Sequence, residues 1–147
     1  MSHIEVGHTR IVQRFSAPAE HVFDAWLDPG KLRAWMFEPE SRGVLRIRVD
    51  ARVGGSFAFI ERHDGRDVVV SGEYLELARP RRLVCTWITD QDSSRQERLT
   101  IDVKALSPGC ELSLTHETYR TTAAAWGRLL EALSRTLALP RQHLAHI

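Results

Sequence analysis

The stretch GEYLELARPRRLVCTW, from Gly72 to Trp87, has the pattern of two β-strands joined by an Arg-Pro corner. Side chains along a strand alternate between the two faces of a sheet, yet Tyr74, Leu75 and Leu77 put apolar side chains on both faces. We interpret this as a curved strand whose inner side meets a helix and a cavity. In this interpretation Gly72 marks a bulge, and exposed Leu75 and Leu77 would suggest a homodimer.

Alternation of apolar and polar residues predicts further strands on both sides of this stretch. Asp64-Gly65, a pair favoured in two-residue hairpin turns, and Ser107-Pro108-Gly109 each separate two of these strands. Connections this short join antiparallel neighbours. Together with the quoted stretch, the predicted strands cover residues 8–15, 44–50, 56–62, 68–78, 82–89, 97–106 and 110–117.

Three segments have helical periodicity instead. Ser16 or Ala17 is placed to cap a first short helix, which breaks at Asp28-Pro29-Gly30, and residues 31–36 form a second. The last helix, predicted over residues 121–139, would be about 28 Å long and could lie across a whole sheet. These elements indicate an α+β fold. An antiparallel sheet of six to seven strands curves around the last helix, and the two short helices lie between strands one and two.

Composition is that of an ordinary globular protein. The 147 residues suit one domain over 1–147, with a core over 8–140. The formal net charge of +1 gives no field that attracts nucleic acid. No run approaches the ~20 apolar residues of a membrane span, and the N-terminus lacks a signal-peptide core. We therefore expect a cytoplasmic protein with neither nucleic acid nor membrane insertion, and we expect Cys85 and Cys110 to be buried free thiols.

Four motifs carry a resemblance to a known superfamily: FDAWLDPGKLRAWM (23–36), VGGSFAF (53–59), GEYLELARPRRLVCTW (72–87) and the Trp126-Gly127 pair that opens the last helix. With them the chain resembles the SRPBCC or START/Bet v 1-like helix-grip superfamily. The most similar branch is that of the activator of the heat-shock chaperone ATPase, the AHSA1-type family. The resemblance extends over roughly residues 8–140. It implies the helix-grip fold, and it makes a chaperone one partner to consider.

Aromatic residues at positions expected to face inward favour a pocket between helix and sheet. Ligand pockets are concave and mostly apolar with a few polar groups, and Trp, Tyr and His offer an apolar body with a polar tip. His116 shares the inward parity of Cys110, Leu112 and Leu114. We therefore predict a binding protein for a hydrophobic small molecule, with no cofactor. The expected ligand-binding residues are Trp35, Phe57, Phe59, Tyr74, Trp87, His116 and Trp126.

Two other functions stay open at this point. The wider superfamily includes aromatase/cyclase and hydrolase-like enzymes, which here would use His116 with Tyr74 or Glu76 as acid and base. Glu76 otherwise reaches water or pairs with a neighbouring arginine, Arg81 or Arg82. The other function is a co-chaperone or stress-response module, which would bind a protein through the outer face of the sheet.

Motifs for catalysis and metal binding do not strengthen the enzyme alternative. The sequence shows no HExxH, GxSxG, Walker or GxGxxG motif. His143 and His146 have a spacing that a metal could use on a helix, but they lie at a chain end, where residues are usually frayed. We therefore expect no metal site, and we favour a binding protein over an enzyme.

Overall fold

The computed structural model describes residues 7–37, 43–89, 96–118 and 120–138. Within these ranges, seven antiparallel strands form one sheet in the order β1-β7-β6-β5-β4-β3-β2. The elements follow the chain as β1 (Gly7–Phe15), α1 (Ala19–Asp24), α2 (Pro29–Trp35), β2 (Gly43–Val49), β3 (Ser56–His63), β4 (Arg66–Ala78), β5 (Arg82–Thr89), β6 (Glu97–Ala105), β7 (Cys110–Thr118) and α3 (Ala123–Ala138).

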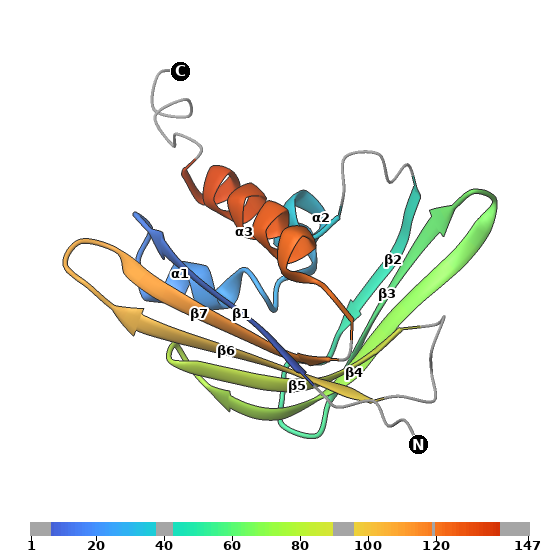
Figure 1. Cartoon of the computed structure of the whole chain (residues 1–147), viewed down its shortest axis with the longest axis horizontal. Helices are drawn as coiled ribbons and strands as arrows, with labels where there is room; N and C mark the ends of the chain where they lie inside the picture. The colour runs from blue at the N-terminus through green and yellow to red at the C-terminus, as the bar shows by residue number, and fades with distance from the viewer. Residues whose placement is uncertain (1–6, 38–42, 90–95, 119, 139–147) are drawn as a thin grey trace.

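The sheet is strongly curved, and α3 lies over its concave face with α2 beside it (Figure 1). Trp126, Leu130 and Leu133 form the buried stripe of α3. This stripe has the helical spacing expected of a face that packs on a core. The arrangement confirms the predicted α+β helix-grip fold, including the two short helices between the first two strands.

Strand β7 shows how alternation builds the inner wall of the sheet. Its buried residues Cys110, Leu112, Leu114 and His116 alternate with half-buried ones, so His116 faces inward as predicted. On the neighbouring strand β6, the buried residues Glu97, Leu99, Ile101 and Val103 share one parity, which begins with Glu97. A carboxylate therefore enters the inner layer next to His116.

The quoted stretch owes its mixed parity to a bulge in β4. Strand pairing with β5 shifts by one residue between Tyr74 and Glu76, so Leu75 is the extra residue and points outward, 38% exposed. Tyr74 before the bulge and Leu77 after it can then both pack on the core. The predicted position of the bulge, Gly72, is therefore wrong.

Gly72 instead permits a close approach of β4 to β5. A Cβ atom at this position would lie 2.0 Å from the backbone oxygen of Thr86 and 2.6 Å from the ring of Phe57. Real Cβ atoms do not come so close to other atoms, so only glycine fits there without a shift of the backbone.

The helix starts also differ from the prediction. The residue before α1 is Pro18 rather than Ser16 or Ala17, and it makes no side-chain cap. Helix α2 begins at Pro29, because the Asp28 side chain accepts hydrogen bonds from two backbone N–H groups of the first turn. Asp28-Pro29 is therefore a start signal, with a capping carboxylate followed by proline at the first helical position.

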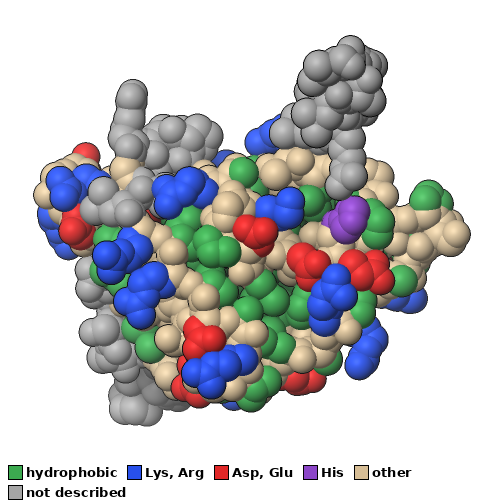
Figure 2. All heavy atoms as spheres, turned by 180° about the vertical axis from the view of Figure 1, so that it is seen from behind, with side chains coloured by type: hydrophobic (Ala, Val, Ile, Leu, Met, Phe, Trp, Pro, Cys, Tyr) green, Lys and Arg blue, Asp and Glu red, His purple; other side chains and the backbone are tan. Residues whose placement is uncertain are grey.

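Other expectations concern cysteines, membranes and metals. Cys85 and Cys110 are buried and free, as predicted. No helix among the described residues is long and apolar enough to cross a membrane. Figure 2 shows basic and acidic side chains interspersed over the face that it displays, without a large region of one sign. His143 and His146 lie outside the described residues.

Candidate ligand-binding pocket

A pocket of about 250 Å³ lies between the first turns of α3 and the inner faces of β3, β4, β5 and β7. Its wall is mostly apolar and includes a few polar side chains. The lining residues are Met36, Phe37, Phe59, Glu61, Val70, Trp87, Thr89, His116, Arg120, Thr122, Ala125, Trp126 and Leu129.

Aromatic rings in mutual contact hold the apolar part of this wall in place. Trp87 lies at its centre, with ring centroids 5.5 Å from Trp126, 6.0 Å from His116 and 6.4 Å from Phe59. Phe59 also meets the edge of Phe37 at 5.8 Å. Tilted and edge-on contacts of this kind are the favoured geometries of aromatic pairs, so the wall is a packed layer of rings.

The structure distributes the seven predicted ligand-binding residues over three places. Phe59, Trp87, His116 and Trp126 line the pocket. Phe57 and Tyr74 do not, but together with Phe59 and Trp87 they line a smaller hollow of about 20 Å³ deeper in the core. Trp35 lines neither space.

Trp35 is part of the core under the two short helices. It is fully buried, its Nε1 donates a hydrogen bond to the backbone oxygen of Ala25 at 3.0 Å, and its ring meets Trp26 edge-on. Helical periodicity identifies Trp35 as buried, but it does not tell whether a buried residue faces a hollow or a filled part of the core.

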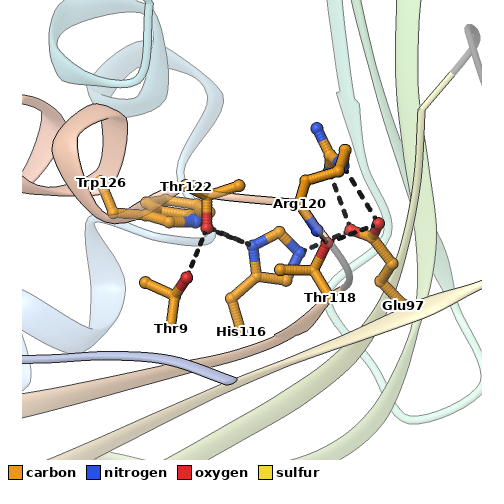
Figure 3. Close-up of polar contacts among 7 residues, drawn as sticks. All are labelled: Thr9, Glu97, His116, Thr118, Arg120, Thr122 and Trp126. Atoms are coloured by element: carbon orange, nitrogen blue, oxygen red, sulfur yellow. Dashed lines mark hydrogen bonds and ion pairs between the residues drawn. The ribbon is translucent and has the colours of Figure 1, made fainter. Parts of the chain in front are cut away.

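His116 is held between two partners on opposite sides of its ring (Figure 3). Trp126 Nε1 lies 3.0 Å from His116 Nδ1, and Glu97 Oε1 lies 2.7 Å from His116 Nε2. An indole N–H can only donate, so Nδ1 must be the acceptor and the proton sits on Nε2, which donates to Glu97. These contacts select one neutral tautomer of the imidazole.

Glu97 is the centre of a second set of contacts. Its carboxylate accepts hydrogen bonds from Arg120 Nη2 at 2.9 Å and Arg120 Nε at 3.2 Å, and from Thr118 Oγ1 at 2.8 Å. With His116, four donor groups surround one buried carboxylate, so its charge is well compensated. Figure 3 shows these residues as one connected row from Trp126 to Arg120.

The network sets the protonation states of its two titratable members. Burial lowers the pKa of His116 below its ordinary value, and the positive charge of Arg120 lowers it further. These two effects outweigh Glu97, whose negative charge and hydrogen bond act to raise the pKa of the ring. For Glu97, burial acts to raise the pKa, but hydrogen bonds from Arg120 and Thr118 and the charge of Arg120 lower it below its ordinary value. At neutral pH the pair is therefore a neutral imidazole and a carboxylate.

The predicted acid–base pairing of His116 with Tyr74 or Glu76 does not form. Tyr74 lines the smaller hollow rather than the pocket, and burial, reinforced by the neighbouring Cys85 and Asp50, raises its pKa. Glu76 is exposed and pairs with Arg82, its Oε1 lying 3.2 Å from Arg82 Nε. The two groups proposed to share one substrate position with His116 therefore lie elsewhere.

Glu97, Arg120 and Thr122 are site residues that our sequence reasoning missed. One signal was available for Glu97, which is charged yet shares the parity of buried Leu99 and Ile101. Arg120 precedes the helix predicted over residues 121–139, and Thr122 lies at the start of that predicted helix, before the first residue of α3. Neither position by itself linked its side chain to the pocket. Among the described residues, no three His, Cys, Asp or Glu side chains come together as a metal site.

Comparisons with known proteins agree with this fold. The family model described as "Activator of Hsp90 ATPase homolog 1-like protein" matches residues 16–138. A solved protein of Chromobacterium violaceum has 29% sequence identity and a TM-score of 0.77, over 90% of this chain and 98% of its own. No curated protein gives a significant match.

Two further solved structures share the fold at lower identity. An AHSA1-like protein of Aeromonas hydrophila has 22% identity and a TM-score of 0.73, over 89% of this chain and 92% of its own. A protein of Rhizobium leguminosarum has 21% identity and a TM-score of 0.79, over 90% and 95%. At these identities the likeness concerns the fold alone.

Proposed function

We propose that this chain, which belongs to the family of Activator of Hsp90 ATPase homolog 1-like proteins, binds a small and largely apolar molecule in the pocket between α3 and the sheet. The observation that carries this proposal is the aromatic pocket of about 250 Å³. A dry apolar cavity of about 150 Å³ accommodates benzene. The pocket therefore suits a somewhat larger molecule, with the size of two fused rings.

Two of the polar side chains in the wall, His116 and Thr122, are already engaged within the chain, which suits an apolar ligand. Both ring nitrogens of His116 are already engaged, and Thr122 donates to the hydroxyl of Thr9. A ligand need not supply partners for these groups, so it gains mainly from transfer of its own apolar surface out of water. The half-exposed Arg120 offers a cationic donor group at one side.

Three consecutive alanines at the start of α3 provide a direct test with a matched control. Ala125 is exposed and lines the pocket, whereas Ala124 is exposed and does not. Ala125→Trp should fill the mouth of the pocket, while Ala124→Trp should place the same ring in water.

The measurement is a titration of each protein with 2-isopropenylnaphthalene, followed through the indole N–H signals in nitrogen–proton NMR spectra. We expect wild type and the Ala124 variant to bind alike. The Ala125 variant should bind at least about tenfold more weakly, a change of about 1.4 kcal/mol. Equal binding by all three proteins, or no binding by wild type, would refute the proposal.

An enzymatic role for His116 is less well supported. A general base must have a free lone pair within reach of the substrate. In this structure the lone pair of Nδ1 is taken by Trp126 and the Nε2 proton by Glu97. The histidine therefore acts as a structural link in the wall.

The family description raises a chaperone partner as the second candidate. Such a role would use the surface, and the large exposed apolar side chains among the described residues are Val12, Val53 and Leu75. Val53, on the turn before β3, and Leu75, on β4, lie on adjacent parts of the sheet, because that turn is hydrogen-bonded to Tyr74. Val12 lies apart from them on β1, at the other edge of the sheet. Binding of a purified Hsp90 that is unaffected by Ala125→Trp would favour the surface role. The homodimer stays a prediction.

A further inference from the structure

The hollow of about 20 Å³ deeper in the core lies next to the pocket. Met36, Phe59 and Trp87 belong to the walls of both spaces, so these three side chains form the partition between them. Methionine is unbranched and adapts its shape readily, which makes Met36 the most easily displaced part of the partition. The hollow is lined by Trp26, Met36, Phe57, Phe59, Tyr74, Leu83, Cys85, Trp87 and Leu99.

Trp26, one of the residues that line this hollow, has an unpaired hydrogen-bond donor. Its Nε1 is buried and has no hydrogen-bond partner among the residues that the structure describes. The whole residue is only 5% exposed. The two tryptophans that touch it are satisfied, because Trp35 donates to Ala25 and Trp126 donates to His116.

An unpaired buried donor is unusual enough to need an explanation. Leaving such a group without a partner destabilises a protein, whereas pairing it recovers that free energy. The edge-on ring of Trp35 lies close to Trp26, but an aromatic face is a weak acceptor compared with an oxygen atom. The Trp26 N–H can therefore donate a hydrogen bond to an acceptor atom from outside the chain.

We infer that the hollow is the inner end of the ligand site, and that the ligand carries an acceptor oxygen that receives a hydrogen bond from Trp26 Nε1. The inference rests on the proposed function, because the apolar body of the same ligand would occupy the larger pocket. A volume of about 20 Å³ is close to the space that one water-sized atom needs, so a single oxygen fits there.

The surroundings indicate that this oxygen is neutral. No cationic side chain lines the hollow in the described part of the chain, and a carboxylate buried without a counter-charge is strongly disfavoured. Burial raises the pKa of the Cys85 thiol to about 12, and burial with neighbouring groups raises that of the Tyr74 phenol, so the wall itself is uncharged. The ligand class is thus an aromatic or alicyclic ketone, ether or alcohol.

The test compares two ligands of the same shape on two proteins. In 2-acetylnaphthalene a carbonyl oxygen occupies the position of the CH2 group of 2-isopropenylnaphthalene. Trp26→Phe removes the donor but keeps an aromatic ring in the core. The ratio of the two dissociation constants is measured for each protein, so that the different hydration of the two ligands cancels.

We expect the ratio of the dissociation constants, hydrocarbon over ketone, to be about tenfold larger for wild type than for the Trp26 variant. This is the effect of one hydrogen bond from a donor that otherwise stays unpaired. An equal ratio in both proteins would overturn the inference and leave the proposed function intact. If neither compound binds wild type, the proposed function fails and the inference falls with it.

A second measurement needs no variant and applies even if Trp26→Phe does not fold. The Trp26 indole N–H signal of the wild-type protein is followed by NMR with each ligand. We expect the ketone to move this signal downfield, as a new hydrogen bond does, while the hydrocarbon does not. A signal at the same position with both bound ligands would contradict the inference.

Discussion

Replacement of Trp126 by phenylalanine tests the hydrogen-bonded row that supports the pocket wall. Trp126 is 4% exposed, and its Nε1 is the donor that occupies His116 Nδ1 at 3.0 Å. Phenylalanine keeps an aromatic ring at this place but has no donor. The nearest other polar group is Thr122 Oγ1, 3.4 Å from Nδ1 and already bonded to Thr9.

The expected loss of stability follows from this geometry. Removal of one buried donor forfeits a hydrogen bond and leaves an acceptor poorly satisfied, a combination that costs about 2 kcal/mol. For a chain of 147 residues this corresponds to a decrease in Tm of about 4–8 °C. The free energy of unfolding from urea titrations at pH 7.5 gives the same quantity independently.

The pH dependence distinguishes the hydrogen bond from mere loss of packing. In wild type, burial and Arg120 lower the pKa of His116 below its ordinary value of 6.5, so the unfolded chain takes up the proton more readily. Stability is therefore complete above pH 6.5 and decreases as the pH falls from there towards the lower pKa of the folded state. Without the Trp126 donor, Nδ1 can accept a proton, and this decrease should be smaller.

Urea titrations between pH 7.5 and 5 measure this difference, with Trp87→Phe as the matched control. Trp87 contacts the same imidazole, at 6.0 Å between ring centroids, whereas the hydrogen bonds of His116 among the described residues go to Glu97, Trp126 and Thr122. We expect the control to keep the pH dependence of wild type. The reasoning is refuted if Trp126→Phe retains the full decrease, or if both variants flatten it equally.

Further expectations concern charge, backbone space and capping. Glu97→Gln should destabilise the fold by about 2 kcal/mol, since Arg120 loses a buried counter-charge. It should also reduce the loss of stability that wild type shows as the pH falls below 4.5, the ordinary pKa of glutamate, while the part contributed by Asp24, whose pKa is lowered by Arg79, stays; an unchanged loss of stability in urea titrations at acid pH would contradict this. Gly72→Ala should destabilise by about 3 kcal/mol or more, because its Cβ would meet a backbone oxygen at 2.0 Å. Gly127→Ala, with open space at its Cβ inside α3, should raise stability by about 1 kcal/mol; similar Tm shifts in both glycine variants would be inconsistent with these two roles. Asp28→Ala should lose about 1 kcal/mol of cap energy, and a neutral result by calorimetry would speak against the cap.

Local periodicity was sufficient to predict the fold of this chain. The strand alternation that ends at His116 and the stripe that begins at Trp126 both depend only on neighbours along the sequence, and both are found as expected. The bulge at Leu75 was not predictable in position, because it depends on the pairing of β4 with β5. Mixed parity signalled that an irregularity exists, and Gly72 was the wrong place for it.

The polar row was harder to predict, because its members come from different parts of the chain. Glu97 and His116 meet because the register of β6 and β7 pairs Leu99 with His116, and no local pattern carries that register. Arg120 joins them from the connection before α3. In the same way, the pattern marks Trp35 as buried, but whether a buried ring borders an empty space depends on the curvature of the sheet.

The polar row also explains how an open pocket can exist beside a buried carboxylate. Atoms that line a hollow lose packing contacts, and a buried charge needs several hydrogen bonds. Trp126 connects the two requirements, because its ring forms the wall while its N–H holds His116 in the tautomer that donates to Glu97. Trp126 therefore belongs both to the aromatic wall of the pocket and to the hydrogen-bonded framework that holds Glu97. It follows that substitutions in this framework should change stability, whereas substitutions at exposed Ala125 should change ligand affinity with little effect on folding.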